Sequence, residues 1–167
     1  GDMIMKQEVI VDEDETGGSL FDKLSALGGS MILSTLKGLE DGTITRTPQG
    51  ESETSYAKML TKEMGHIDWT KDAVSIERLV RGLNPWPSAY TRLDGKTLKI
   101  WRANVLPDEK KAAPGCIIKA EKGSFLVQTG DGVLELLEVQ LEGKKRMTTD
   151  AFLNGYTVEE GTYFTRG

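Results

Sequence analysis

Residues 89–105 read AYTRLDGKTLKIWRANV, and this stretch decides the fold of the larger part of the chain. Apolar and polar side chains alternate on both sides of Asp94-Gly95, a dipeptide that favours the tight turn of a β-hairpin. The stretch therefore predicts two antiparallel strands, at residues 89–93 and 97–105.

Three further strands are expected at residues 115–120, 124–129 and 133–140, because each apolar run is bounded by a glycine-containing turn. Five short antiparallel strands are typical of a small barrel of the oligonucleotide-binding (OB) type. A β-sandwich has similar strand spacing and stays an alternative. A short helix capped by Thr148 and running to about Gly155 follows the strands.

A helix is also expected before the strands. Thr70 is a suitable N-cap, Asp72 lies in the first turn, and the pair Asn84-Pro85 ends the helix. Apolar side chains recur at helical spacing along it, at Ala73, Ile76, Leu79, Val80 and Leu83.

The N-terminal 41 residues predict one strand and one helix. Residues 3–11 are rich in apolar and β-branched side chains, and Ser19 is a suitable N-cap for a long apolar helix that runs up to Gly42. One strand and this helix cannot together bury the apolar side chains of the helix. Residues 1–41 are therefore interpreted as the last βα piece of a larger domain. Polar residues with glycine and proline follow, so residues 42–62 are interpreted as a linker to a second domain, residues 63–167.

Charge is distributed unevenly along the 167 residues, whose net charge is −5. Residues 1–60 carry 5 basic and 11 acidic side chains, whereas residues 61–167 carry 16 and 15. The difference indicates two functional units. The negative overall charge argues against a nucleic-acid binder, but this argument is weaker for residues 61–167, whose charges nearly balance.

Several classes of protein are excluded by composition. One cysteine, Cys116, and one histidine, His66, cannot build a disulfide scaffold or a zinc site of several Cys and His ligands. No apolar run reaches the roughly 18 residues that cross a bilayer, and the first residues lack the order of a signal peptide. We expect a soluble, cytoplasmic protein with no membrane or metal partner.

The basic run Gly143-Lys144-Lys145-Arg146 is not a phosphate-binding Walker motif, because Glu138 stands where the upstream glycine is required. Three adjacent cations fit either a solvated turn or contact with nucleic-acid phosphates. The residues alone leave both interpretations open.

Two other motifs have an ordinary structural interpretation. His66 and Asp68 could form an oriented general base, but a surface histidine is the favoured interpretation because no nucleophile is placed by a motif. The corner Asn84-Pro85-Trp86-Pro87 is rigid, and Trp86 is expected to join Trp69 and Trp101 in an aromatic core, with base stacking as the alternative.

A series of short motifs resembles methionyl-tRNA formyltransferases. In chain order they are Tyr56 to Glu63, Ile67-Asp68-Trp69, Arg81 to Pro87, Leu98 to Trp101, Thr129 to Gly132, and Gly143 to Met147. The opening Gly1-Asp2-Met3 also resembles the end of a segment of that family.

The resemblance implies an enzyme that transfers a formyl group from 10-formyltetrahydrofolate to the amino group of methionine on initiator tRNA. The family joins an N-terminal Rossmann-like domain through a linker to a C-terminal barrel. Its catalytic asparagine, histidine and aspartate lie upstream of Gly1, and His66 matches a linker position. The chain is therefore expected to bind no cofactor itself, to lack the catalytic residues, and to need the missing N-terminal catalytic domain as a partner.

The resemblance also favours tRNA contact for the basic side chains. Lys62 matches a linker lysine near the acceptor end, and the run of residues 144–146 matches a basic barrel loop. The expected tRNA-binding residues are Lys62, Arg78, Arg81, Lys144, Lys145 and Arg146.

Three alternatives remain open. One is a related folate-dependent formyltransferase that acts on a sugar nucleotide, or a folate-hydrolysing relative. Another is a stand-alone OB-type module that binds single-stranded nucleic acid through exposed aromatic side chains. The third is a small enzyme that uses His66 and Asp68.

Overall fold

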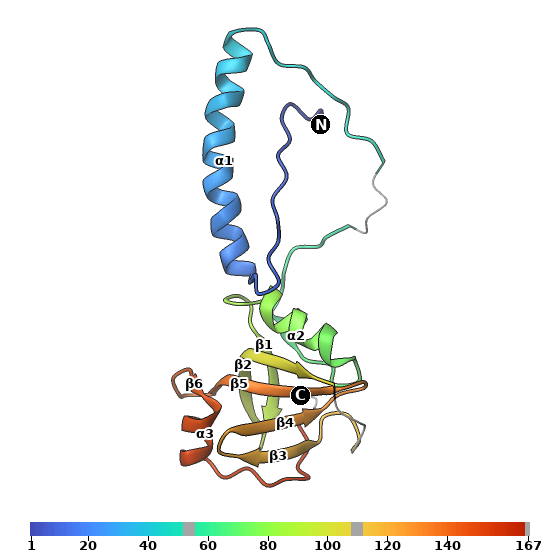
Figure 1. Cartoon of the computed structure of the whole chain (residues 1–167), viewed down its shortest axis with the longest axis vertical. Coiled ribbons are helices and arrows are strands. Elements are labelled where there is room, and N and C mark those ends of the chain that lie inside the picture. Colours follow the sequence, from blue (N-terminus) through green and yellow to red (C-terminus); the bar gives the residue numbers. More distant parts are fainter. Residues whose placement is uncertain (52–55, 108–111, 166–167) are drawn as a thin grey trace. The chain divides into compact units, whose positions relative to one another are not determined.

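The computed structural model describes residues 1–51, 56–107 and 112–165. The chain divides into two compact units, Gly1–Met59 and Leu60–Gly167, and Figure 1 shows their elements. The first unit contains one long helix, and the second contains a sheet with short helices packed on it.

The second unit is built on an antiparallel sheet in the order β1-β2-β5-β4-β3, with β6 paired to β5. The five strands expected from the sequence are confirmed to within a few residues, because alternating side chains and glycine turns are local signals. The strands are β1 (Ala89–Leu93), β2 (Lys96–Leu106), β3 (Ile117–Glu121), β4 (Ser124–Gln128), β5 (Val133–Leu141) and β6 (Met147–Thr148).

The sheet is not closed, because β1 and β3 do not pair with each other in the described part of the chain. The C-terminal segment lies between these two edges: the backbone N–H of Thr165 donates to Arg92 O (3.2 Å) and that of Phe164 to Gly115 O (2.9 Å). Isolated bridges therefore join the edges where a closed barrel has a continuous ladder.

The turn between β4 and β5 contacts the start of a helix that precedes the strands in the chain. Gly130 donates its backbone N–H to Lys71 O (2.8 Å), and Asp131 O accepts from Ala73 N (2.8 Å). A side-chain Cβ at residue 130 would lie 1.9 Å from Thr70 O, so only glycine fits this approach. The glycine-containing turn expected between residues 124–129 and 133–140 is confirmed, and it also contacts a helix.

That helix, α2 (Ala73–Gly82), begins at Asp72 rather than at the expected N-cap Thr70. The Asp72 carboxylate accepts from the backbone N–H of Ser75 (2.8 Å), whereas the Thr70 hydroxyl donates to Asp68 Oδ1 (2.7 Å). Both Thr70 and Asp72 are suitable N-cap residues, and in the structure Asp72 is the one that caps the helix. Helix α2 packs on β2 and β5.

Two shorter helices complete the second unit. The 3₁₀ helix η1 (Lys62–Gly65) lies beside β1, and α3 (Thr149–Gly155) packs near β5 and β6. Thr148 caps α3 as expected, since its hydroxyl accepts from the backbone N–H of Ala151 (3.3 Å).

The expected core of three tryptophans is wrong. Trp69 is buried, stacks on Phe164 with ring centroids 5.2 Å apart, and donates its indole N–H to the Thr91 hydroxyl (3.1 Å). Trp86 is 56% exposed, and Trp101 lies half-buried on the outer side of β2. Aliphatic side chains and phenylalanines supply most of the core, with Phe125 among the largest fully buried side chains.

The first unit contains α1 (Gly17–Glu40), whose N-cap is Thr16 and not Ser19. The two side chains cap reciprocally: Thr16 Oγ1 accepts from Ser19 N (3.1 Å), and Ser19 Oγ accepts from Thr16 N (2.9 Å). Ser19 thus occupies the third helical position of a capping box, a role the sequence analysis did not assign.

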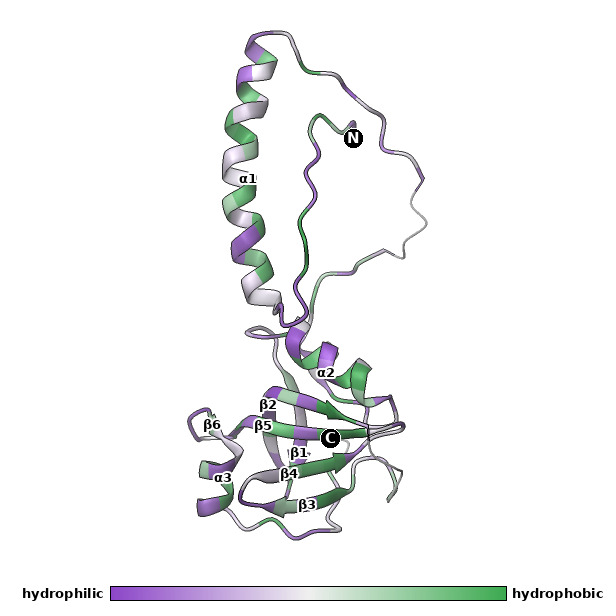
Figure 2. Cartoon of the chain, in the orientation of Figure 1, coloured by the Kyte–Doolittle hydropathy of each residue, from purple (hydrophilic) through white to green (hydrophobic). Residues whose placement is uncertain are grey.

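The strand expected at residues 3–11 is absent: Met3 makes an isolated bridge to Thr47, and no strand follows. A strand needs a neighbour for its backbone groups, and β-branched composition alone does not supply one. No residue of α1 is buried, and large apolar side chains such as Phe21 (70%) and Leu33 (69%) are exposed. Figure 2 shows these hydrophobic positions along α1.

Candidate functional site

The basic run at residues 144–146 occupies the loop between β5 and β6. A turn forms its start, with the backbone N–H of Lys144 donating to Leu141 O (2.9 Å) and Gly143 at φ +75°. Residues Met147 and Val139 pair directly after the loop. The loop is therefore held at both ends, and all three basic side chains are exposed.

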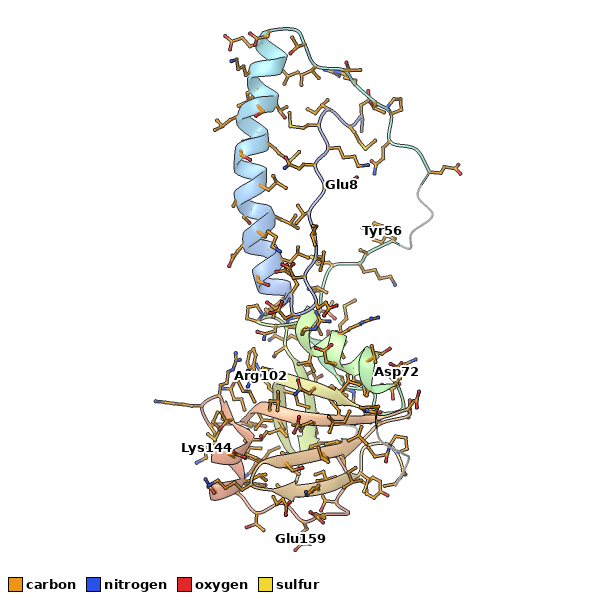
Figure 3. The ribbon with its side chains drawn as sticks, in the orientation of Figure 1. Glu8, Tyr56, Asp72, Arg102, Lys144 and Glu159 are labelled. Carbon is orange, nitrogen blue, oxygen red and sulfur yellow. The ribbon has the colours of Figure 1, made fainter. Side chains whose placement is uncertain are left out.

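The three cations of the loop do not have the same surroundings. The Arg146 guanidinium donates to Glu138 Oε2 (Nε to Oε2 2.6 Å), and its Cζ lies 5.0 Å from the centroid of Trp101. Within residues 1–51, 56–107 and 112–165, neither Lys144 nor Lys145 makes an ion pair. Only the two lysines therefore present unpaired charge. Figure 3 labels Lys144, and Arg102 of β2 at the same side of this unit.

Trp101, which the sequence analysis assigned to the core with base stacking as the alternative, lies instead beside Arg146 of the basic loop. Strand β2 has a bulge here: Ile100 pairs with Val139 and Arg102 with Glu138, which leaves Trp101 without a partner in the register. The extra residue places Trp101 and Arg102 next to each other outside the core, as β-bulges do near functional sites. A signal was present, because strict alternation would have buried Arg102 between Ile100 and Asn104.

The corner that follows α2 contacts the bulge. The Asn84 amide donates to the backbone carbonyl of Trp101 (Nδ2 to O 3.2 Å). This contact satisfies a carbonyl at the bulge, where the register of the ladder shifts. The Asn84 to Pro87 corner therefore supports the outer face of β2 instead of contributing Trp86 to the core.

Lys62 lies in η1 and is exposed. The chain just beyond it runs beside β1, where His66 bridges to Tyr90 and their ring centroids are 5.4 Å apart. The predicted linker lysine therefore lies next to one edge of the sheet. Strand β2 separates that edge strand, β1, from β5, and the loop with Lys144 follows β5.

Asp68, close to His66 in the sequence, has a structural role. Asp68 Oδ1 accepts from both the backbone N–H (3.1 Å) and the hydroxyl (2.7 Å) of Thr70. His66 Nε2 is buried and has no hydrogen-bond partner in the described part of the chain. These contacts hold the turn that precedes α2.

The two arginines of α2 differ in exposure. Arg81 is partly buried and donates to the Glu77 carboxylate one helical turn away (Nε to Oε1 2.6 Å). Arg78 is exposed. The pKa of the neighbouring Asp72 is lowered, mainly by the hydroxyl and backbone N–H of Ser75 and to a smaller extent by the charge of Arg78. Both arginines lie on α2, whereas residues 144–146 lie in the loop between β5 and β6.

Neither a metal centre nor a membrane segment is found in the part of the chain that the structure describes. Its His, Cys, Asp and Glu side chains form no group of three that could hold an ion. Among the same residues, no helix combines the length and apolar character that crossing a membrane requires.

The sequence of the second unit matches a known protein family. Residues 59–157 match the family described as formyl transferase, C-terminal domain. This chain belongs to that family. The match covers most of the second unit, including Trp101, the loop of residues 144–146 and α3.

Relatives of this formyltransferase domain extend the similarity to nearly the whole chain. The methionyl-tRNA formyltransferase of Agathobacter rectalis is 58% identical over 165 residues, which is 99% of this chain and 53% of that protein. The methionyl-tRNA formyltransferase of Lachnospira eligens is 49% identical over 166 residues, 96% of this chain and 53% of that protein. The chain thus spans about half the length of these relatives.

A solved structure has a similar fold. HypX from Aquifex aeolicus, in a complex with tetrahydrofolic acid, has a TM-score of 0.52 over 81% of this chain and 26% of its own length. The two sequences are 21% identical, so the likeness concerns the fold alone.

Proposed function

We propose that this chain is the C-terminal half of a methionyl-tRNA formyltransferase and that it holds initiator tRNA for the catalytic half. The observation that carries the proposal is the 58% identity over 99% of the chain to a protein of that name. The whole enzyme transfers the formyl group of 10-formyltetrahydrofolate to the amino group of methionyl-tRNA in the cytoplasm, where translation begins.

In this proposal the chemistry belongs to the half of the relatives that the chain does not cover. The first unit is then the last part of a Rossmann-like domain, and the uncovered apolar side chains of α1 pack on the remainder of that domain. The second unit is an OB-like barrel completed by the C-terminal segment that bridges β1 and β3.

The second unit binds the tRNA through electrostatic contacts. Lys144 and Lys145 are exposed and make no ion pair within the described residues, so their charge is available to phosphates. Each phosphate that is neutralised releases counterions, which gives binding a steep dependence on salt. The other proposed contacts are Lys62, Arg78, Arg81 and Arg146.

A stand-alone nucleic-acid-binding module is not favoured. The relatives match this chain from the first unit through to the second, beyond the limits of the barrel. A module that worked by itself would not require α1, whose 24 residues are all at least partly exposed.

The test measures binding of fluorescently labelled initiator tRNA to the chain at several salt concentrations. We compare the wild type with the triple variant K144A/K145A/R146A and with the control K6A/K37A/R46A, which removes the same charges from the first unit. We expect weak binding that falls steeply with salt, a slope shallower by about two for the loop variant, and no change for the control. An unchanged slope for the loop variant contradicts the proposed contact.

A second measurement tests where the chemistry resides. The purified chain is mixed with 10-formyltetrahydrofolate and methionyl-tRNA, and formyl-methionine is quantified. We expect no product above the level without protein. Turnover by the pure chain would show that catalytic groups lie within these residues.

A further inference from the structure

A cluster of two cations and one aromatic ring lies on the outer face of β2, beside the basic loop. Lys99 Nζ lies 5.6 Å and Arg146 Cζ 5.0 Å from the centroid of the Trp101 ring. Both distances fall within the range of cation–π interactions. Lys99 and Arg146 come from different elements, so the indole ring holds together two charges that the sequence places far apart.

Trp101 is held by hydrogen bonds at its indole ring and at its backbone. Its indole N–H donates to Gln140 Oε1 (3.2 Å), while its backbone carbonyl accepts from Asn84 (3.2 Å). The Gln140 amide donates in turn to the backbone carbonyl of Lys144 (3.0 Å). One side chain of β5 thus connects the indole to the basic loop, so the ring and the loop have a defined relation.

The cluster carries excess positive charge. Glu138 is the carboxylate that faces it, and it accepts from Arg146 and lies 3.7 Å from Arg102 Nε. Arg102 and Arg146 therefore share one carboxylate, and no ion pair of Lys99 is found within the described residues. Glu142 also lies nearby, and the hydrogen bond that its carboxylate accepts from the backbone N–H of Thr97 (2.9 Å) lowers its pKa and keeps it charged, so the three cations outnumber the two carboxylates by one.

The surface beside the cluster has room for a ligand. A hollow of about 320 Å³ is lined by Lys99, Gln140 and Gly143 together with their neighbours Thr97, Leu141 and Glu142. The lining joins β2, β5 and the start of the basic loop. A phosphate group that enters this hollow meets Lys99 within a short distance of the backbone of the loop.

The cluster also lies between the two tRNA contacts that the sequence predicted. Lys99 is paired in register with Tyr90 of β1 on one side and with Gln140 of β5 on the other. Tyr90 contacts His66, which follows η1 and Lys62. A row of outward side chains therefore crosses the sheet from the predicted linker contact to the basic loop.

We propose that Lys99 and Arg146, positioned by Trp101, form a binding site for the phosphodiester backbone of the RNA. The inference rests on the proposed function and extends it to residues on the sheet itself. The indole fixes both cations before the RNA arrives, so less side-chain freedom is lost on binding. In this proposal the phosphate oxygens accept from the N–H donors of Lys99 and Arg146 that do not contact Glu138. Trp101 is a positioning residue, because it acts through the two cations.

The experiment measures the salt dependence of tRNA binding for three variants of the chain. Lys99→Gln removes one cation, Trp101→Leu removes the ring but no charge, and Trp101→Phe keeps an aromatic face. The matched control is Lys71→Gln, an exposed lysine beside Asp72, which Figure 3 labels on the other side of this unit from Lys144. Circular dichroism and thermal unfolding verify that each variant is folded.

We expect Lys99→Gln to weaken binding about threefold to tenfold and to reduce the salt slope by about one. Trp101→Leu has a comparable effect on both quantities although no charge is removed, Trp101→Phe is close to the wild type, and Lys71→Gln is unchanged. This loss of salt slope without loss of charge is the sign of positioning, since a merely structural role of the ring would not produce it in a folded variant.

Two results overturn the proposal. If Trp101→Leu weakens binding with an unchanged salt slope, the ring stacks on a base and does not position cations. If neither Lys99→Gln nor Trp101→Leu alters binding, the RNA does not touch this face, and the proposed function still stands as long as the K144A/K145A/R146A variant binds less tightly. Failure of the wild type to bind contradicts the proposed function itself.

Discussion

The two units of the chain differ in what covers their apolar side chains. In the second unit, β strands and short helices enclose a core whose largest members, such as Phe125 and Ile76, are almost completely buried. In the first unit, α1 is well capped and 24 residues long, yet none of its residues is buried. Local helix signals can therefore be complete where tertiary packing is missing, because capping and side-chain periodicity depend only on neighbours in the sequence.

The largest expected effect contrasts a buried phenylalanine with an exposed one. Phe125→Ala removes a fully buried ring near Phe152 and Phe164 and should lower the free energy of unfolding by about 3–5 kcal/mol. Phe21→Ala, at a side chain 70% exposed, should change it by less than about 0.5 kcal/mol. Urea unfolding followed by tryptophan fluorescence measures the first change, because the second unit holds all three tryptophans, and the helical circular dichroism signal measures the second change in α1. Equal effects of the two substitutions on the free energy of unfolding would contradict the difference in burial between the two units.

Glycine substitutions should have opposite signs in the two units. Gly130→Ala places a Cβ against the backbone carbonyl of Thr70 and should destabilise the second unit by about 1–3 kcal/mol. Gly28→Ala adds a Cβ to α1 with no atom within 4 Å, so it should favour the helix by about 1 kcal/mol. Thermal unfolding measures the first change and the helical circular dichroism signal the second. A stable Gly130→Ala protein would mean that the turn and Thr70 can separate at little cost.

The capping box of α1 should contribute a smaller amount. Thr16→Ala removes the acceptor of the Ser19 backbone N–H and should cost about 1 kcal/mol of helix stability, whereas Thr16→Ser keeps the contact and serves as the control. Circular dichroism at 222 nm over a temperature range compares the two variants. An identical signal for both would show that α1 does not depend on its cap.

The smallest expected effect depends on pH at the start of α1. Hydrogen bonds from Lys23, and then from Ser19, lower the pKa of Glu15 from 4.5 to about 2. Because the pKa is lower in the folded state, the contact stabilises the structure above pH 4.5, and this contribution is lost as the pH falls from about 4.5 to 2. The helical signal should decline over this range, and a Glu15→Gln variant should not show this part of the decline. The same pH dependence in both proteins would assign it to other carboxylates.

The elements that local signals specify could be predicted, and the contacts between elements could not. The five strands from residue 89 onward, the cap at Thr148 and the position of the basic loop followed from alternation, glycine turns and charge, whereas the strand expected at residues 3–11 is absent. The environment of Arg146 did not, because Trp101 and Glu138 reach it only through the pairing of β2, β5 and β6. Trp101 was assigned to the core because the bulge in β2 is a property of the register and not of the strand sequence.

The sequence by itself determined the family, the series of strands and the charged loop, since these depend on short-range patterns and on motif order. Only the tertiary structure decided that the sheet stays open between β1 and β3, that Trp69 alone of the three tryptophans enters the core, and that Lys99 and Arg146 meet over Trp101. The physical reason is that strand register and side-chain burial are set jointly by segments far apart in the chain, so no single stretch of residues encodes them.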